Sequence, residues 1–540
     1  MSVTVAPAFY CPIEHAHRRL DVAEEVCAGR FTHHGLSLDL GLPPDWRSSA
    51  LPPDDEWRIE WWKHYEGLDL AHAFHATGER RFADAWESLV TSFVEQVPVG
   101  SDTSDVAARR LTNSIYAWTS FGDAVDVALA DRIAAEVAFV RDHLTPERNH
   151  RTLELYALFL ASLAFPDAEL LAFATAELER NLRDDFRPDG VHREASTHYH
   201  MVALRSFVAA LEDGRRFGVR FSADFVRRLE RAYEFACHVR RPDGSIPALS
   251  DSDNGDYTAL LELAGALLGR SEPRACSASF PDGGYYVQRS GWDSDARFLI
   301  FDCGPLGDGG HGHYDLLSVE IATGCPLVVD PGRGTYSEAG PNLRRWFKRT
   351  SAHNTVLVDG LDQTPYRRGK PKGEVATGRL LARFTRPGLD LLTGEARSPV
   401  YEAVHERRVL FVGGEYWLIE DLLRGERPHE YELRFHLAPG TATVDGPVVR
   451  APGLTLVLAD GLEACLEPGL VAPSYGELVD APVVVARAGG IEARFLTLVF
   501  PADEVPSLRE RDGAVEVATT GFRDALAWTT DRALWTREAP

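Results

Sequence analysis

The sequence predicts a multidomain α + β protein in which a helical first half is followed by an antiparallel β-sandwich. From residue 56 to about residue 270, apolar residues recur every three or four positions, and Pro, Gly, Asp or Ser end each run. Beyond residue 275 the chain changes to short β-rich runs separated by turn residues, such as 284–288 and 416–421. The length of 540 residues also exceeds what one hydrophobic core usually serves.

The helical half shows local start signals. Thr145 is a candidate N-cap followed by Pro146 at the first helical position, and the helix predicted there carries an apolar face. Asp167 is predicted to cap the next helix. Successive helices of this length, joined by short loops, indicate helical hairpins arranged as a solenoid or a toroid.

Four segments are predicted along the chain. Residues 1–55 form an N-terminal segment that packs on the helical domain, which itself spans 56–275. Residues 276–442 form a central antiparallel β-sandwich. Residues 443–540 continue the β pattern, either as part of the same sandwich or as a small separate module.

The charge and cysteine content limit the classes of partner and compartment. A formal net charge of −24 argues against capture of nucleic acid or of an anionic membrane surface. No apolar stretch reaches the roughly 18–20 residues of a membrane span, and the first residues lack a secretory signal, so we expect a cytoplasmic protein. Seven scattered cysteines predict mostly buried thiols in a reducing compartment. A homo-oligomer is left open.

Three residues of the β half form a candidate metal-binding group. His313, Asp330 and His353 supply two imidazoles and a carboxylate, a ligand set suited to zinc. Asp330 lies between Val-Val and Pro-Gly, where an unpaired buried carboxylate would be costly and a cation would offset that cost. Two other readings stay open: the histidines are hydrogen-bonded structural residues, or the cation is Arg344, Arg345 or Lys348.

Other polar clusters are candidates for catalysis. His311 lies among glycines, which permit close approach of a ligand but also mark ordinary turns. Residues 148–151 put four polar groups at the start of a helix, where a solvated helix end is the alternative. Residues 192–200 crowd histidines, an arginine, a glutamate and a tyrosine after an Asp-Gly turn, a density that favours a functional site. Basic pairs such as 109–110, 344–345 and 367–368 are places where an anionic substrate could dock.

At these motifs the sequence resembles the heparinase II/III family of polysaccharide lyases. The resemblance is carried by Arg-Asn149-His-Arg, by residues 189–200, by Ser-Asp-Ser-Asp at 250–253, by His311-Gly-His313, and by Asp330-Pro-Gly with His353-Asn-Thr. It implies an incomplete α/α toroid followed by an antiparallel β-sandwich, with the substrate cleft between them. It also implies β-elimination at a uronic acid of an acidic glycan.

The resemblance further implies roles for individual residues. Asn149 would neutralise the uronate carboxylate, Tyr199 would act as base and acid, and His311 would serve as base for the other uronate epimer or assist the transfer. His313, Asp330 and His353 would bind one structural divalent metal, zinc by ligand type. Candidate substrate-binding residues are His150, Arg151, Arg110, Glu194 and His198.

The chain departs from the family pattern in two respects. Better-known members are exported, whereas the start of this sequence shows no export signal, and Arg151 stands where an apolar residue is frequent. For these reasons heparin or heparan sulfate is not assumed, and the expected substrate is an acidic oligosaccharide or a polymer made in the cell. The alternatives are a metal-containing glycan hydrolase or other glycan-processing enzyme on the same scaffold, and a non-catalytic glycan-binding protein.

Overall fold

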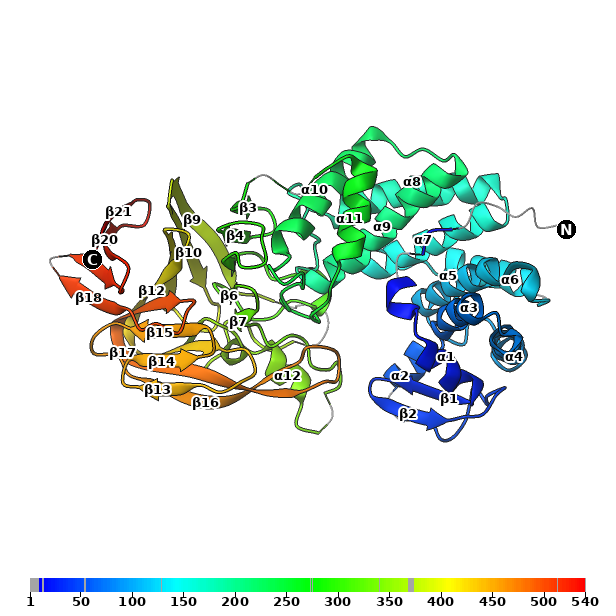
Figure 1. Cartoon of the computed structure of the whole chain (residues 1–540), viewed down its shortest axis with the longest axis horizontal. Helices are drawn as coiled ribbons and strands as arrows, with labels where there is room; N and C mark the ends of the chain where they lie inside the picture. Colours follow the sequence, from blue (N-terminus) through cyan, green and yellow to red (C-terminus); the bar gives the residue numbers. More distant parts are fainter. Residues whose placement is uncertain are drawn as a thin grey trace. The chain divides into compact units, whose positions relative to one another are not determined.

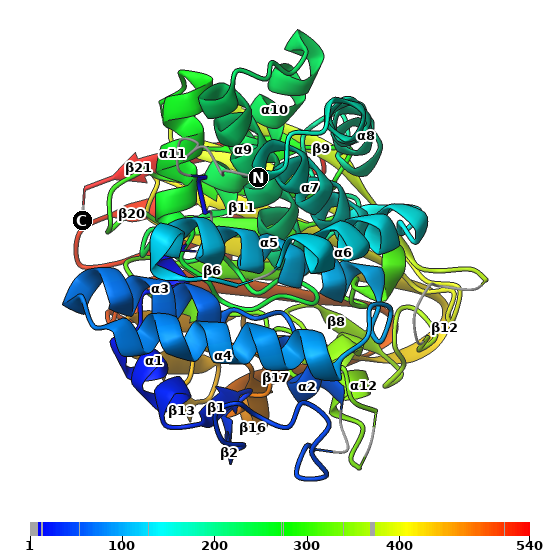
Figure 2. The same cartoon turned by 90° about the vertical axis from the view of Figure 1, so that its right-hand side faces the viewer.

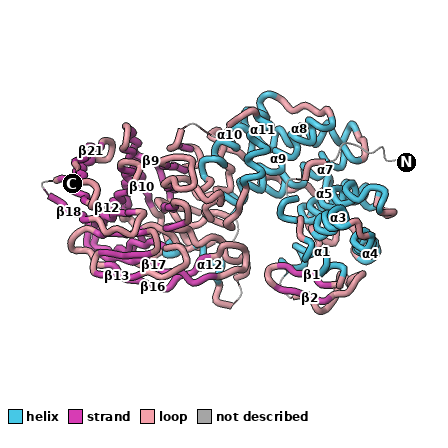
Figure 3. Tube along the Cα trace, viewed as in Figure 1, coloured by secondary structure: helices cyan, strands magenta, loops and turns pink. Residues whose placement is uncertain are grey.

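The computed structural model describes residues 9–539 except 12, 13, 53, 54, 128, 272, 274, 339, 368–372 and 512. The chain divides into two compact units. Unit 1 contains Met1–Phe186, Val202–Glu230 and Ala266–Arg270, and unit 2 contains Arg187–Met201, Arg231–Gly265 and Ser271–Pro540. Helices dominate the first half of the chain and strands the second (Figure 3), so the predicted fold class is confirmed.

Unit 1 is built from paired helices. Its elements are α1 (Leu20–Cys27), β1 (Arg30–His33), β2 (Leu36–Asp39), α2 (Asp55–Trp61), α3 (Glu66–Thr77), α4 (Arg80–Gln96), α5 (Ser104–Phe121), α6 (Ala130–Asp142), α7 (Arg148–Ala164) and α8 (Ala168–Asp185). Helices α3, α5 and α7 pack in a row, and α4, α6 and α8 each pack on the helix that precedes them (Figure 2). This is the repeated hairpin arrangement expected from helices joined by short loops.

The start of α7 differs from the prediction. The helix begins at Arg148 with Glu147 as its N-cap residue, not at Thr145 and Pro146. The reason is a competing interaction: the Thr145 amide and hydroxyl bind the buried Glu154 carboxylate at 2.7 and 2.8 Å. Asp167 does cap α8, because its side chain accepts a hydrogen bond from the Leu170 amide at 2.9 Å.

Three further helices divide between the two units. They are α9 (Thr197–Phe217), α10 (Ala223–Val239) and α11 (Thr258–Leu268). The first turn of α9, with Tyr199, belongs to unit 2 together with the strands. Among the described residues, no helix is long and apolar enough to cross a membrane.

The described part of unit 2 contains three antiparallel sheets, and most of their strands are labelled in Figure 1. The five-stranded sheet runs β3 (Ala278–Phe280), β4 (Tyr285–Arg289), β5 (Phe298–Asp302), β6 (Val319–Ala322), β7 (Pro326–Val328). The ten-stranded sheet runs β13 (Thr443–Asp445), β14 (Val448–Ala451), β15 (Leu454–Leu458), β17 (Val479–Phe500), β12 (Tyr416–His436), β11 (Val404–Val412), β10 (Leu389–Arg397), β9 (Thr377–Arg386), with β16 (Ala464–Val471) on β17 and β8 (Val356–Val358) on β12. The four-stranded sheet runs β18 (Ser507–Arg511), β19 (Ala514–Ala518), β20 (Arg523–Trp528), β21 (Ala533–Glu538).

The centre of the ten-stranded sheet is buried on both faces. Along β12, Trp417 and Ile419 join the core formed with the five-stranded sheet, whereas Tyr416 and Leu418 join the core formed with the four-stranded sheet. Successive side chains of a strand point to opposite faces of the sheet. A strand whose two faces are both covered therefore needs apolar side chains at every position, which gives an unbroken apolar run. This explains the continuous run at 416–419 in the sequence.

The loops between strands of unit 2 carry the candidate metal-binding residues. His311 and His313 follow β5, Asp330 follows β7, and His353 precedes β8 in the loop after α12 (Leu343–Lys348). All seven cysteines are free thiols. Only Cys237 and Cys303 are buried, so the expectation that most of the thiols are buried is wrong.

Candidate active site and metal group

The first turn of α9 is fixed by serine side chains. Ser196 caps the helix by accepting a hydrogen bond from the Tyr199 amide at 3.3 Å, and its hydroxyl donates to the Asp251 carbonyl at 2.8 Å. The amide of the preceding residue, His198, donates to the Ser252 hydroxyl at 3.1 Å. The short loop 250–253 therefore sets the position of Tyr199.

Tyr199 lies against His311. Their ring centroids are 4.0 Å apart, and the Tyr199 hydroxyl is 2.6 Å from the Tyr336 hydroxyl. Burial raises the pKa of Tyr199 to about 12. In this arrangement Tyr199 is a neutral phenol near pH 7, available as a proton donor.

His311 is held in one tautomer by Asp251. Its Nδ1 is 2.8 Å from Asp251 Oδ2, and Arg344 forms a two-pronged ion pair with the same carboxylate. Burial alone would raise the pKa of Asp251, but the Arg344 charge and the hydrogen bonds hold it well below its usual range. Because an ionised carboxylate only accepts, His311 Nδ1 carries the proton and Nε2 keeps a lone pair. Burial also lowers the pKa of His311, which favours the neutral ring.

Two cations fix the backbone just before His311. Lys348 Nζ donates to the Gly310 carbonyl at 2.6 Å, and Arg344 Nη2 donates to the same oxygen at 3.1 Å. The preceding glycines, Gly309 and Gly310, both adopt positive φ angles (79° and 85°), a conformation that other residues rarely take. The backbone of the glycine-rich loop is therefore fixed by these hydrogen bonds, unlike that of an ordinary exposed turn.

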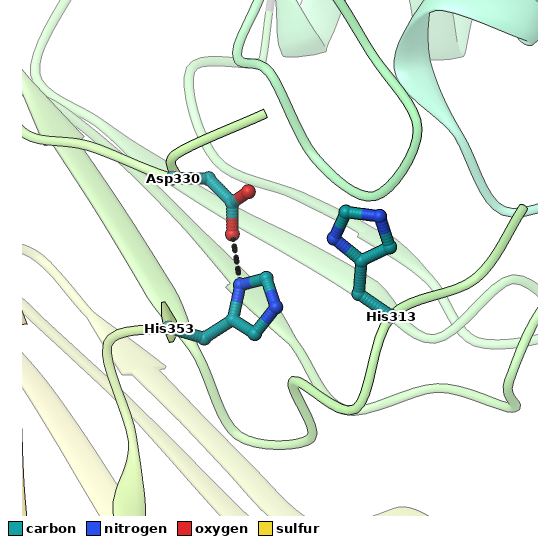
Figure 4. Close-up of side chains that lie close together, drawn as sticks. All are labelled: His313, Asp330 and His353. Atoms are coloured by element: carbon teal, nitrogen blue, oxygen red, sulfur yellow. Dashed lines mark hydrogen bonds and ion pairs between the residues drawn. The ribbon is translucent and has the colours of Figure 1, made fainter. Parts of the chain in front are cut away.

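The structure brings His313, Asp330 and His353 together, all buried, as Figure 4 shows. One ligand atom from each lies within 4.8 Å of the others, so this group could hold a metal ion. His353 Nδ1 lies 2.7 Å from Asp330 Oδ2, and His313 Nε2 lies 2.9 Å from Asp251 Oδ1.

The remaining ring nitrogens fit a metal. His313 Nδ1 and His353 Nε2 are buried and have no hydrogen-bond partner among the described residues. Burial lowers the pKa of His313 to about 4, so its ring is neutral, as metal ligation requires. A metal-bound histidine usually donates its other N–H to a carboxylate, which is the relation of His313 to Asp251.

The cations proposed from the sequence as substitutes for a metal at Asp330 are engaged elsewhere. Arg344 binds Asp251, and Lys348 binds the Gly310 carbonyl. Arg345 is exposed and lies over the Tyr366 ring at 5.6 Å. These three cations are thus engaged away from Asp330, whose carboxylate binds His353.

The candidates from the start of α7 belong to unit 1. Asn149 is buried, and His150 lies 3.9 Å from Asp105. Burial lowers the pKa of His150. Arg151 donates to Glu177 at 2.5 Å and to the Thr145 carbonyl.

Arg110 also belongs to unit 1. Its guanidinium binds Asp102 at 2.6 Å and Glu136 at 3.0 Å, and only 3% of the residue is exposed. This geometry favours a structural role for Arg110. The other two candidates, Glu194 and His198, flank Tyr199 in unit 2, with Glu194 buried and His198 Nδ1 3.3 Å from the Tyr257 hydroxyl.

Sequence reasoning gave no role to Asp251, Asp253, Arg333 or Tyr336, which the structure places around Tyr199 and His311. The only local signal was the dense Ser-Asp-Ser-Asp run at 250–253. Asp251 meets His311, Asp253 meets Arg333 and Tyr336 meets Tyr199 across 60 or more positions of the chain, beyond the range of any local pattern.

Curated relatives match most of the chain. The heparin-sulfate lyase of Pedobacter heparinus is 22% identical over 93% of this chain and 83% of its own length. The heparin-sulfate lyase of Bacteroides stercoris is 24% identical over 76% of this chain and 68% of its own length.

The fold is that of a known lyase. The crystal structure of heparinase III superposes with a TM-score of 0.79 at 17% sequence identity and covers 100% of this chain and 93% of that one. Sequence profiles of the heparinase II/III N-terminus and of the heparinase II/III-like C-terminal region match residues 13–266 and 272–494. With both profiles matched in order along the chain, the protein belongs to the heparinase II/III family of polysaccharide lyases.

Proposed function

We propose that the protein cleaves a uronic-acid-containing glycan by β-elimination and leaves a 4,5-unsaturated uronate at the new end. The observation that carries this proposal is the contact of Tyr199 with His311, whose Nδ1 is bound to the carboxylate of Asp251. A phenol and a neutral imidazole whose Nε2 carries a lone pair lie side by side, which supports an elimination. Because the curated relatives are named heparin-sulfate lyases, the substrate class that we propose is a glycosaminoglycan.

The reaction requires an acidified C5–H bond. This proton is weakly acidic because it lies next to the uronate carboxylate, and neutralising that carboxylate stabilises the developing enolate. In our proposal, Asn149 donates hydrogen bonds to the carboxylate, with His150 or Arg151 beside it.

Proton transfer then falls to Tyr199 and His311. For one uronate epimer, the Tyr199 phenolate removes the C5 proton, the C4–O4 bond breaks with its electron pair going to O4, and Tyr199 returns the proton to O4. For the other epimer, His311 Nε2 removes the proton from the opposite face and Tyr199 protonates O4. The pKa of Tyr199, about 12, suits the second route, in which Tyr199 starts as the acid, whereas the first route requires its phenolate to be stabilised.

The second part of the proposal is that His313, Asp330 and His353 bind one zinc ion. The two imidazole nitrogens without partners among the described residues, together with a carboxylate, match the ligands that zinc prefers. Zinc would supply a fixed positive charge that holds these side chains together. His313 shares Asp251 with His311, so the metal group supports His311 without contact to the substrate.

The test is a panel of uronate glycans, sulfated and unsulfated, followed by the ultraviolet absorbance of the unsaturated uronate. We expect absorbance to rise with at least one glycosaminoglycan and Tyr199→Phe to abolish the rise. Tyr366→Phe is the matched control, because its hydroxyl binds Glu338 at 2.5 Å instead. A hydrolase would yield new reducing ends without the absorbance, and a binding protein would bind the glycan without turnover. Either result would overturn the proposal.

A further inference from the structure

Tyr336 connects Tyr199 to a partly buried ion pair. The two hydroxyl oxygens are 2.6 Å apart, and Arg333 Nη1 donates to the Tyr336 hydroxyl at 3.1 Å. Arg333 in turn forms a two-pronged ion pair with Asp253, in which Nε lies 2.7 Å from Oδ1. Asp253, Arg333, Tyr336 and Tyr199 therefore form one chain of hydrogen bonds, and all four residues belong to unit 2.

The direction of these hydrogen bonds follows from their chemistry. A guanidinium has donors only, so Arg333 occupies a lone pair of the Tyr336 oxygen. The single proton of Tyr336 is then free to point to the Tyr199 oxygen. When Tyr199 is ionised it can only accept, and the bond between the two tyrosines must run from Tyr336 to Tyr199.

Arg333 is held in place for this task. Its guanidinium lies over the rings of Tyr336 and Tyr475, at 5.5 and 5.2 Å from their centroids, while Asp253 binds its edge. Such contacts fix the orientation of the arginine fork as well as its charge. The positive charge of Arg333 therefore stays two hydrogen bonds away from the Tyr199 oxygen, with the Tyr336 hydroxyl between them.

We propose that Tyr336 is a positioning residue of the elimination, whose hydroxyl, oriented by Arg333, donates to the Tyr199 oxygen and stabilises its phenolate. This inference rests on the proposed role of Tyr199 as base. The Tyr199 phenolate takes the proton from C5 and gives it to O4 as the C4–O4 bond breaks, so the proton count is unchanged. Tyr336 keeps its own proton throughout.

The surroundings of Tyr199 explain why this support matters. Burial raises the pKa of Tyr199, and the charges of Asp251 and Glu194 act in the same direction. The Arg333 charge and the hydrogen bond from Tyr336 oppose them. The other titratable groups against the Tyr199 ring are His311 and His198, at centroid distances of 4.0 and 5.5 Å.

The test is Tyr336→Phe, which removes the hydroxyl and keeps the ring. A hydrogen bond to a charged group contributes enough that its loss should raise the pKa of Tyr199 by about one to two units and lower kcat near pH 7 by about 10- to 100-fold. Activity should recover as the pH rises, whereas KM should change by less than about twofold, because substrate binding is untouched. Tyr366→Phe is again the control.

A second pair of variants guards against misfolding of the first. Arg333→Lys retains a positive charge and a donor, so it should keep more activity than Arg333→Met. A direct readout needs no substrate, because phenolate absorbance after rapid pH jumps reports the titration of tyrosines. The difference in absorbance between the wild type and Tyr199→Phe isolates the titration of Tyr199. The same difference measured in the Tyr336→Phe background gives the titration of Tyr199 without the Tyr336 hydroxyl. An upward shift without the Tyr336 hydroxyl supports the proposal.

The outcomes separate this inference from the proposed function. If Tyr199→Phe is inactive but Tyr336→Phe keeps the wild-type kcat, pH profile and Tyr199 titration, the role of Tyr336 is refuted and the lyase proposal stands. If the wild type releases no unsaturated product from any glycan of the panel, both fail.

Discussion

Asp251→Asn is the substitution expected to disturb the candidate site most. Asp251 is fully buried, and its two oxygens bind His311 at 2.8 Å, His313 at 2.9 Å and both terminal nitrogens of Arg344. Asparagine has nearly the same shape, but it replaces one acceptor oxygen by an NH2 group that faces donors. The substitution therefore removes the charge without creating a cavity.

The expected loss of stability follows from the uncompensated charge of Arg344. Breaking a buried ion pair by neutralising one partner costs about 3–5 kcal/mol. For a unit of this size, 1 kcal/mol corresponds to roughly 2 °C in Tm, so we expect Tm to fall by about 6–10 °C. The hydrogen bonds to the two histidines share the same carboxylate, so their losses do not add in full.

The sign of the pH dependence is set by the lowered pKa of Asp251. The pKa in the folded chain lies well below that of an unfolded aspartate, about 3.9, so the stabilisation is present above pH 4 and lost as pH falls toward the folded pKa. The difference in Tm between the wild type and Asp251→Asn should thus be largest at neutral pH. It should shrink in acid.

Calorimetry at neutral pH measures the stability, and kcat at saturating glycan measures the loss of a fixed His311 tautomer, expected at about 100-fold or more. Asp84→Asn is the control, because Asp84 pairs with Arg80 at an exposed site and should leave Tm unchanged. Combining Asp251→Asn with Arg344→Met should recover part of the lost stability, since the buried charge is then gone. A Tm within about 2 °C of the wild type for Asp251→Asn would refute the reasoning.

Three further predictions concern other groups. Burial raises the pKa of Asp213 to about 7, above its value in the unfolded chain. Its contribution to stability is therefore complete below about pH 4 and falls as the pH rises through 7. Asp213→Asn should flatten this decline when Tm is measured across a series of pH values. Metal analysis should find about one zinc per chain. Chelation should lower Tm, and the free energy of unfolding should fall by about 3 kcal/mol if the metal is present at 100 times its Kd. His353→Ala should lose both the metal and the response of Tm to chelator. Arg407 is fully buried and paired with Asp421 at 2.6 Å. Arg407→Met should lower the free energy of unfolding, measured with denaturant, by about 3–5 kcal/mol, because it leaves the Asp421 charge buried without its partner. A loss below about 1 kcal/mol would contradict the role of this ion pair.

The fold could be predicted because its signals are periodic. Helical hairpins leave apolar residues at three- and four-residue spacing, and β12 leaves an unbroken apolar run because both faces of the ten-stranded sheet are covered. The start of α7 could not be predicted in the same way. Thr145 has the chemistry of an N-cap, but its two donors bind Glu154, which lies nine positions further along the chain, within α7.

The candidate site was predicted in part. His313, Asp330 and His353 stand out because each sits in a turn beside a strand, and the resemblance to a known family pointed to Tyr199 and His311. The residues that orient them were missed because their contacts are long-range: Tyr336 is 137 positions from Tyr199, and Arg344 is 93 positions from Asp251. An aspartate between serines gives no sign of which histidine it will meet.

The loop at residues 250–253 explains how the two candidate acid and base groups keep a fixed relation. Asp251 binds His311 directly, whereas Ser252 binds the first turn of the helix that carries Tyr199. Asp253 reaches the Tyr199 hydroxyl from the other side through Arg333 and Tyr336. A displacement of this loop would move both groups together, while a change at His313 would reach His311 through the shared carboxylate of Asp251. Loss of the metal should therefore lower kcat by displacing His311. In Asp251→Asn that connection is already broken, so chelator should no longer change kcat as it does in the wild type.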